Sequence, residues 1–446
     1  MNQFCARRLD RLPELLELHR HNPDHWPFLL SSTAGAQGLG RWSLLLRHSG
    51  EVVSQPTDQD GGSGFLDALR RRTDHSQKRR PGLPALPFFG GWFLYLGYEL
   101  AAEIEPRLNL SAAADGLPLA YAARCPAGVL IDHQRREGWL VAENPAWLER
   151  IEQEVCSARL APGPQLGSRG FDLDLRADPG EGFMRGVERI RAWILAGDVF
   201  QVNLSRGWRA RRPAALDALE VYRALAAANP APFAGLARLP GGTVISSSPE
   251  RLVSVTGDCV QTRPIAGTRP RGASRDQDLS LSSELIADPK ERAEHIMLID
   301  LERNDLGRVC RSGSVVVDEL MVVESYAHVH HIVSNIRGRL ETGVTAADVI
   351  AAVFPGGTIT GCPKVRCMEI IAELEAAGRG FYTGSMGYLG LDGAMDLNIL
   401  IRSMVVGPEE LSFRTGAGIV ADSDPAAELA ETEAKARGLL KALGVA

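Results

Sequence analysis

The sequence has 446 residues, a length that suits two or three domains or one large α/β or α+β unit. Hydrophobic residues form 45% of the chain and charged residues 23%, which excludes a disordered chain, a coiled coil and a collagen. The formal net charge of -6 leaves no basic excess for a phosphate backbone, and no apolar run approaches the roughly 20 residues that cross a bilayer. We therefore expect a cytoplasmic protein that binds neither nucleic acid nor a membrane.

The predicted elements become denser after a break rich in proline and glycine, residues 161–182, which we interpret as a linker. It separates an N-terminal region, residues 1–160, from a motif-rich region, residues 183–443. The spacing of apolar and turn residues predicts helices over 183–196, 289–301 and 425–443, and strands over 200–210, 244–247, 251–255, 259–265, 315–317, 382–389, 397–406 and 411–414. Because strands and helices do not alternate strictly, we expect an α+β fold.

Two acidic residues stand on separate predicted helices, Glu294 and Glu431, each on or near the side expected to face inward. Carboxylates that converge from two elements suit Mg²⁺, which favours oxygen ligands and keeps part of its water shell. The alternative is that Glu431 forms an i,i+4 ion pair with Lys435 while Glu294 lies on a solvated face. The spacing alone leaves both interpretations open.

Two glycine-rich segments could present free backbone N–H groups to an anion. The first, residues 354–371, has the glycine spacing of a phosphate loop but continues with Cys362-Pro363-Lys364 instead of Gly-Lys-Ser/Thr. The second, residues 415–423, is predicted to expose backbone donors just before the last helix. For the first segment, a helix start that needs glycine for its turn is an equal alternative.

Three further side chains are candidates for chemistry. Glu250 follows a strand and a proline, where burial could keep a carboxyl protonated as a general acid, although a loop ion pair with Arg251 is the alternative. His331 lies in a strand-like alternation, where an inward histidine is usually a hydrogen-bonded core residue. Arg402 is a charge inside an apolar predicted strand, so it must find an anionic partner.

Eight motifs occur in an order that resembles the chorismate-utilising enzymes, particularly the synthase subunits of aminodeoxychorismate synthase and anthranilate synthase. They are GDVFQVNLSR (197–206), SSSPERL (246–252), TRPIAGTRPRG (262–272), ERAEHIMLIDLERNDLGRV (291–309), VHHIVSNIRGRL (329–340), FPGGTITGCPKVRCMEII (354–371), GSMGYLG (384–390) and GAGIVADS (416–423). The resemblance implies a four-layer α/β/β/α fold with two orthogonal antiparallel sheets flanked by helices.

The resemblance also implies roles for individual residues. Glu294 and Glu431 would bind Mg²⁺, Glu250 would be the acid that assists departure of the C4 hydroxyl of chorismate, and His331 would line the ring. The two substrate carboxylates would be held by Arg402, Tyr382, Lys435 and the backbone of Gly416, Ala417 and Gly418, with Thr360 nearby. A dianion that binds a protein of net negative charge needs such local cations and N–H donors.

Gln201 bears on the nucleophile. Relatives that add water to chorismate resemble this chain but have a lysine at this position, whereas ammonia-using members have glutamine. The resemblance therefore implies ammonia, delivered by a glutamine amidotransferase partner, because nothing in this chain resembles a Cys-His-Glu glutaminase.

Position 266 bears on the product. Aminodeoxychorismate synthases often carry PIKGT, whose lysine attacks the ring covalently, but this chain has PIAGT, and Ala266 cannot be a nucleophile. That departure resembles anthranilate synthase, whereas VHHIVS, FPGGTITG and the shorter N-terminal third resemble the aminodeoxychorismate branch. We expect 4-amino-4-deoxychorismate, made for 4-aminobenzoate and folate synthesis, with anthranilate plus pyruvate as the alternative. A non-catalytic binding subunit is the alternative of another class.

The family also has an amino-acid pocket in its N-terminal region, which binds tryptophan. The matching residues are Ser32, Arg41, Trp42, Pro232, Phe233 and Ala234. The usual LLES is LLSS here, so Ser31 replaces the acid that would pair with a ligand amine. A vestigial packed core between the two halves of the chain is an equal alternative to a tryptophan site.

Overall fold

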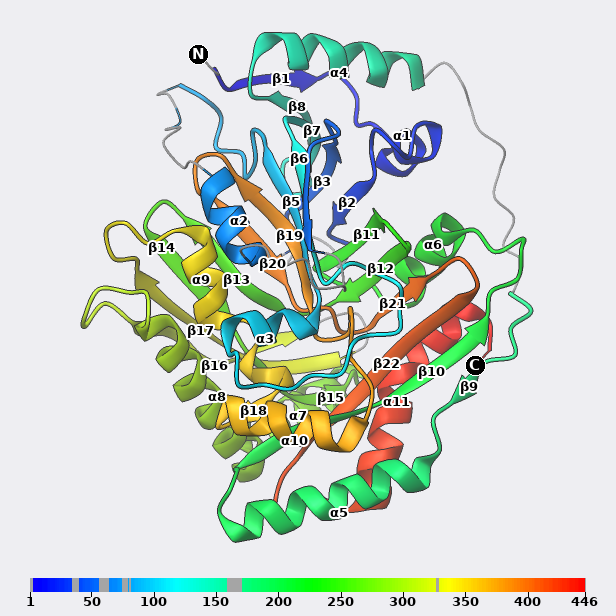
Figure 1. Ribbon diagram of the computed structural model, residues 1–446, viewed down its shortest axis with the longest axis vertical. Helices are drawn as coiled ribbons and strands as arrows, with labels where there is room; N and C mark the ends of the chain where they lie inside the picture. The colour runs from blue at the N-terminus through cyan, green and yellow to red at the C-terminus, as the bar shows by residue number, and fades with distance from the viewer. Residues whose placement is uncertain are drawn as a thin grey trace.

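The computed structural model describes residues 3–33, 40–55, 64–73, 79, 82–158, 171–325 and 329–445 (Figure 1). Two antiparallel sheets form its centre. The larger has 12 strands in the order β1-β8-β7-β3-β2-β11-β12-β21-β22-β10-β18 with β9 beside β10, and the smaller has 10 in the order β15-β17-β14-β13-β20-β19-β5-β6-β4 with β16 beside β17. The expected α+β class is confirmed, because most neighbouring strands are antiparallel and helices lie outside the sheets.

The strands of the larger sheet are β1 (Cys5–Leu9), β2 (Phe28–Ser31), β3 (Trp42–Arg47), β7 (Ala127–Asp132), β8 (Glu137–Ala142), β9 (Arg176–Ala177), β10 (Gln201–Arg211), β11 (Phe233–Leu239), β12 (Gly242–Ser248), β18 (Gly361–Cys362), β21 (Ser403–Val406) and β22 (Glu410–Ile419). The smaller sheet contains β4 (Val52–Gln55), β5 (Gly91–Leu96), β6 (Ala120–Cys125), β13 (Arg251–Thr256), β14 (Cys259–Arg263), β15 (Ile265–Pro270), β16 (Val316–Ser325), β17 (Val329–Arg339), β19 (Ser385–Gly390) and β20 (Met395–Asn398).

The helices are α1 (Leu15–His21), α2 (Phe65–Arg72), α3 (Ala101–Ile104), α4 (Pro145–Ala158), α5 (Gly180–Ala196), α6 (Ala218–Ala228), α7 (Arg275–Ala287), α8 (Pro289–Gly307), α9 (Ala346–Val353), α10 (Lys364–Glu375) and α11 (Pro425–Leu443), with short 3₁₀ turns over Tyr98–Leu100 and Gly357–Ile359. Helix α11 begins at Pro425 because the Asp424 side chain accepts from the next two free backbone N–H groups. None of the described helices is long and apolar enough to cross a membrane.

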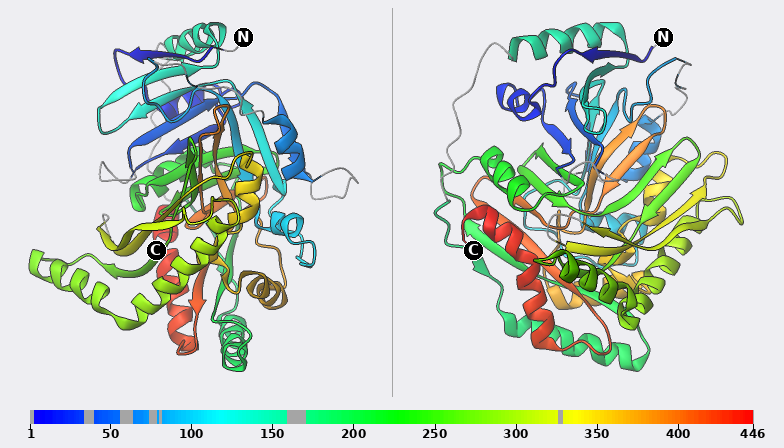
Figure 2. Two further views of the ribbon diagram at one scale, coloured as in Figure 1. Left: turned by 90° about the vertical axis from the view of Figure 1, so that its left-hand side faces the viewer. Right: turned by 180° about the vertical axis from the view of Figure 1, so that it is seen from behind.

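Successive side chains along each strand face opposite sides of the sheet, which gives the four expected layers. Leu44 and Leu46 of β3 pack between the sheets, whereas Leu45 between them packs under the outer helices α1, α4, α6 and α11. In the smaller sheet, Phe93 faces the larger sheet and Leu94 faces the opposite layer, which includes α2, α8 and α9. Figure 2 shows α11 along β22 and beside α5, outside the larger sheet.

Two of the places where the chain passes from one sheet to the other lie next to each other. The chain leaves the larger sheet after Ser248 and enters the smaller one at Arg251, and it returns between Asn398 and Ser403. The predicted strand over 397–406 is therefore wrong as one element, since four of its residues form this second crossing. There Arg402 adopts a left-handed backbone conformation with φ of 50°.

The glycine segment 415–423 also differs from its prediction. Gly416, which is buried, and Gly418, which is half-buried, lie inside β22 and pair with β10, and not in an exposed turn before α11. The pairing of β22 with β21 ends at Phe413 and Met404, so beyond that point none of the described strands pairs with this edge of β22. The backbone donors predicted for this segment can face a ligand only along that edge.

Both sheets combine strands from the N-terminal and the C-terminal regions of the chain. In the larger sheet, β2 pairs with β11, so Leu29 lies opposite Leu236. Residues 161–170 of the predicted linker lie outside the described residues, and the domain limits at 160 and 183 stay predictions. Strand pairs within both sheets therefore join the two regions.

Candidate active site

The two crossings bring Glu250 and Arg402 to one place. The backbone N–H of Ile399 donates to the Glu250 carbonyl at 3.0 Å, and that of Ser247 donates to the Arg402 carbonyl at 3.1 Å. The Ser248 hydroxyl donates to the Ile399 carbonyl at 2.5 Å and ties the crossings together again. A carboxyl and a guanidinium from sequence positions 152 residues apart are thus fixed by short backbone connections.

Glu250 is buried, and its Oε1 atom has no hydrogen-bond partner among the described residues. Burial raises the pKa of Glu250 to about 7, while the Thr358 hydroxyl, the Ile265 backbone and the Lys435 ammonium oppose that shift. The alternative of an ion pair with Arg251 is excluded, because Arg251 pairs with Asp396 at 2.8 Å. A carboxyl with this pKa carries its proton at neutral pH often enough to act as a general acid.

Arg402 is partly buried, and in the part of the chain that the structure describes no carboxylate pairs with it. Its one hydrogen bond runs from Nη1 to the Asn229 Oδ1 atom at 3.4 Å. Burial lowers the pKa of Arg402, as expected for a cation without an anion beside it. The described residues do not supply the anionic partner that the sequence demands, which leaves the guanidinium available to a ligand carboxylate.

His331 is close enough to Arg402 and Lys435 for both cations to influence its protonation. Burial, followed by Arg402 and then Lys435, lowers the pKa of His331 to about 3, so the imidazole is neutral. Its Nδ1 atom lies 2.9 Å from the Thr268 hydroxyl and 3.3 Å from the Gly267 carbonyl, which can only accept. The Nδ1 atom therefore carries the proton, and the ring is held in one orientation.

Lys435 reaches from α11 to the free edge of β22. Its Nζ atom donates to the Gly416 carbonyl at 3.0 Å and pairs with Glu431 at 2.7 Å. A Cβ atom on Gly416 would lie 2.8 Å from the Tyr382 hydroxyl, so only glycine allows that approach. Burial raises the pKa of Tyr382 to about 12, and its phenol stays a hydrogen-bond donor.

Gln201 lies at the start of β10, buried, with its Oε1 atom unpartnered among the described residues. Its Nε2 atom would lie 2.3 Å from a Cβ atom on Gly418, so the amide packs directly on the strand. Ala417 points away into the apolar cluster under α5.

Thr360 differs from the other predicted site residues, because its hydroxyl donates to the Gly356 carbonyl at 2.9 Å and stabilises a turn.

The predicted metal ligands lie close enough to repel each other. Burial raises the pKa of Glu294 to about 7, and the carboxylates of Glu291, Glu428 and Glu431 add to the shift while Lys290 opposes it. Glu431 makes the i,i+4 pair with Lys435 that the sequence offered as an alternative. No group of three or more His, Cys, Asp or Glu side chains arranged for a metal is found within the described ranges.

The model of the chorismate-binding enzyme family matches residues 27–441. This chain belongs to that family. Similar proteins include anthranilate synthase component 1 of Haloarcula marismortui, 51% identical over 98% of this chain and 91% of the relative. Another is aminodeoxychorismate synthase component 1 of Bacillus subtilis, 42% identical over 80% and 77%.

The solved structure of anthranilate synthase component I from Streptococcus pneumoniae TIGR4 is also similar. It has a TM-score of 0.80 and 31% sequence identity, and the match covers 90% of this chain and 92% of that one. The recognition from eight ordered motifs is therefore confirmed at the level of the family, and so is the fold that it implied.

In this member of the chorismate-binding enzyme family, the structure brings only some of the residues of the predicted amino-acid pocket next to each other. Strand pairing sets Ala234 opposite Ser31, and the Ser32 hydroxyl is buried without a partner among the described residues. Arg41 instead pairs with Asp132 at 2.7 Å and lies over the Trp42 ring. Pro232 directly precedes β11 and Phe233 is its first residue, and the Arg251 guanidinium lies over the Phe233 ring. A tryptophan site stays a prediction.

Ala266 lies on β15 opposite Ile332 of β17, beside the segment that carries His331. The side chain at this position offers no nucleophile, as the sequence indicated.

Sequence reasoning missed several residues of the candidate site. Thr268 orients His331, and the Asn203 Oδ1 atom would lie 2.9 Å from a Cβ atom on Gly416. Both were inside motifs that had been recognised, but their side chains gave no local chemical signal. Lys364 is one of few lysines in an arginine-rich chain, and this scarcity could have directed attention to its pair with Asp305.

Proposed function

We propose that this protein is a synthase component that uses ammonia to aminate chorismate. The observation that carries the proposal is that two neighbouring crossings hold Arg402, which no carboxylate of the described residues pairs, and Glu250, a buried acid with a pKa of about 7. Arg402 and Lys435 supply the positive charge that a dianionic substrate needs in a chain of net charge -6. The names of the similar proteins support the same substrate.

The proposed reaction moves one proton to the leaving group. Arg402 would orient a substrate carboxylate, and the neutral His331 and the Tyr382 phenol would line the ring. Glu250 would donate its proton to the C4 hydroxyl as the C–O bond breaks, so that water leaves and not hydroxide. Gln201 cannot deprotonate water as a lysine could, which favours ammonia as the nucleophile.

The donor set at Glu294 and Glu431 fits Mg²⁺, since two converging carboxylates plus water and a substrate carboxylate satisfy its preferences. When bound there, Mg²⁺ would neutralise part of the substrate's negative charge. The mutual repulsion that raises the pKa of Glu294 supports this assignment, because a cation would relieve it.

The metal assignment predicts that Glu294→Gln needs at least about tenfold more Mg²⁺ for half-maximal rate than the unaltered protein. The amide keeps the shape of the side chain but weakens an oxygen ligand. The measurement is the initial rate of chorismate consumption against Mg²⁺ concentration. Glu433→Gln is the matched control, because Glu433 lies on the same helix as Glu431 and is 63% exposed. An unchanged Mg²⁺ requirement in Glu294→Gln would remove this residue from the metal site.

For the product, we propose 4-amino-4-deoxychorismate. The VHHIVS and FPGGTITG motifs support it, and so does Ser31, whose hydroxyl lies 3.2 Å from that of Ser43 where a tryptophan-regulated relative would place an acid. Ala266 favours anthranilate as the second candidate, because it removes the lysine used in covalent amination. Incubation with chorismate, Mg²⁺ and ammonium separates the two. An amino product that retains the enolpyruvyl group supports the first, and fluorescent anthranilate with released pyruvate supports the second.

The nitrogen donor would be a glutamine amidotransferase partner. A glutaminase needs an activated thiolate, but burial raises the pKa of Cys310 to about 11 and that of Cys125 to about 12. Burial also raises the pKa of Cys5, Cys362 and Cys367. The isolated chain should therefore use ammonium and not glutamine, and glutamine-dependent turnover should require the added partner.

Arg402→Met should lower kcat/KM for chorismate by about 10- to 150-fold, the loss of one charge-assisted hydrogen bond. Its folding stability should not fall, because no protein carboxylate loses a partner. Arg402→Lys should recover part of the activity. Urea unfolding of Arg251→Met gives the contrast, since that guanidinium holds Asp396 at 2.8 and 2.9 Å and its loss should destabilise the fold. Equal destabilisation by both methionine variants would contradict the proposed role of Arg402.

A further inference from the structure

A second buried carboxyl lies behind Glu250. Glu302 of α8 is 6% exposed and faces groups from three other elements, namely Glu250 at the first crossing, Thr262 of β14 and Lys364 of α10, besides Asp305 on its own helix. Burial first, and then Asp305 and Glu250, raise the pKa of Glu302 to about 8, while Thr262 and Lys364 oppose the shift. The mechanism above does not use this group.

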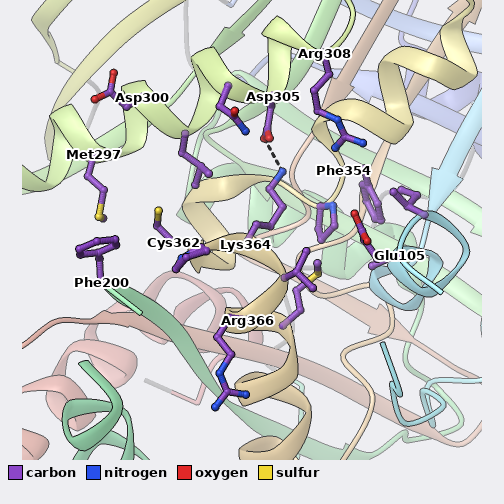
Figure 3. Close-up of a pocket in the computed structure, with 18 of the residues that line it drawn as sticks. Glu105, Phe200, Met297, Asp300, Asp305, Arg308, Phe354, Cys362, Lys364 and Arg366 are labelled. Atoms are coloured by element: carbon purple, nitrogen blue, oxygen red, sulfur yellow. Dashed lines mark hydrogen bonds and ion pairs between the residues drawn. The ribbon is translucent and has the colours of Figure 1, made fainter. Parts of the chain in front are cut away.

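The helix that carries Glu302, α8, lines a surface pocket of about 820 Å³ (Figure 3). Asp305 and Lys364 line this pocket and form an ion pair at 2.5 Å. Leu301, the residue before Glu302, also lines it, whereas Glu302 is buried and is not one of the lining residues. Glu302 therefore stands one helical turn before Asp305, which lines the pocket, and its carboxyl interacts electrostatically with that of Glu250.

Packing does not explain why a carboxyl, and not an uncharged side chain, occupies position 302. Burying an ionisable carboxyl is unfavourable, and a glutamine of the same shape would fill the same space and hydrogen-bond there. Glu250 must regain its proton after each turnover. Glu302 can gain and lose a proton near neutral pH and could supply that proton, whereas an amide could not.

We propose that Glu302 relays protons between Glu250 and the pocket by way of Asp305. The inference rests on the proposed function and holds for either product, since both need the C4 hydroxyl to leave. Glu250 gives its proton to the departing hydroxyl, which becomes water, and is left as a carboxylate. Glu302 returns a proton to Glu250 and takes one from pocket water through Asp305. The nitrogen that gained the C–N bond releases one proton, so the overall reaction consumes none.

The test compares Glu302→Gln with the unaltered full-length protein, using chorismate, Mg²⁺ and ammonium. The expected result is a kcat at least tenfold lower, an unchanged KM for chorismate, a larger solvent deuterium isotope effect on kcat, and a displaced basic limb of the pH profile. Glu302→Asp should recover part of kcat. Asp300→Asn is the matched control, because Asp300 lines the same pocket but is 66% exposed and pairs with Arg303, and it should change none of these quantities.

An unchanged kcat in Glu302→Gln would overturn the relay, and so would a lower kcat with an unmoved pH profile and isotope effect, which is the mark of a structural role. If Glu302→Gln does not fold, Asp305→Asn tests the outer half of the path, with the same isotope effect expected and its absence counting against the relay. Failure of the proposed function is a separate outcome, because the unaltered protein would then give no aminated product.

Discussion

Glu250→Gln should lower kcat by about 10² to 10⁴-fold, the usual contribution of a positioned general acid. Glutamine keeps the size and most of the polarity of the side chain, and KM for chorismate should therefore change little. The measurement is steady-state turnover with saturating ammonium and Mg²⁺. A residual rate within a factor of about three of the unaltered protein would exclude Glu250 as the acid.

The protonation state of Glu250 also predicts the direction in which kcat/KM changes with pH. Glu250 must be protonated to donate, and burial raises its pKa to about 7, so kcat/KM should fall as the pH rises above about 7. In Glu250→Gln that limb should be absent. Glu143→Gln is the control, because Glu143 is also a buried carboxyl with a raised pKa, but it pairs with Arg124 at the far end of the sheets. It should lower stability and leave the pH profile unchanged.

Glu375→Gln should lower the free energy of unfolding by about 3–5 kcal/mol, the effect of removing one partner from a buried ionic cluster. Glu375 ends α10 and is buried with Arg379 at 2.7 Å and Arg414 at 2.8 Å, so the amide would leave two guanidinium groups without an anion. It also accepts from the Ser205 N–H and hydroxyl, which joins α10 to the β10–β22 pair behind the site.

Urea unfolding measures this loss, and Glu373→Gln on the same helix is the matched control. Glu373 pairs with Arg189 at the surface, and its replacement should change stability by no more than about 1 kcal/mol. Although burial alone would raise the pKa of Glu375, Arg379 and Arg414 hold it below its usual value. Its contribution is therefore present at neutral pH and lost as the pH falls below about 4. Equal effects of the two variants would show that the cluster is not stabilising.

The sequence predicts the regular parts of this fold well, because burial on one face imposes periodicity. Helix 183–196 and strand 200–210 are found as α5 and β10 with ends shifted by a few residues. The crossing at residues 399–402 is hidden, since three of its four residues, Ile399, Leu400 and Ile401, are as apolar as the strands on either side. An apolar run records burial, and it does not show that the chain changes sheets within it.

For the candidate site, side chains with a distinctive local setting were predictable and those defined by tertiary neighbours were not. Arg402 stands out as a charge among apolar residues, and Glu250 follows a strand and a proline. Glu302 sits in a run of charged residues on α8, and only the packing of β14 and α10 against that helix makes it a buried carboxyl. Long-range contacts of this kind leave no trace in local spacing.

The origin of the new bond is the most direct test of the whole account. The purified protein is incubated with chorismate, Mg²⁺ and ¹⁵N-labelled ammonium in ¹⁸O-labelled water, and the product is analysed by mass spectrometry. The account predicts that one ¹⁵N atom enters each product molecule and that no ¹⁸O does. A product that carries ¹⁸O and lacks ¹⁵N would contradict it, because Gln201 would then have to support the addition of water.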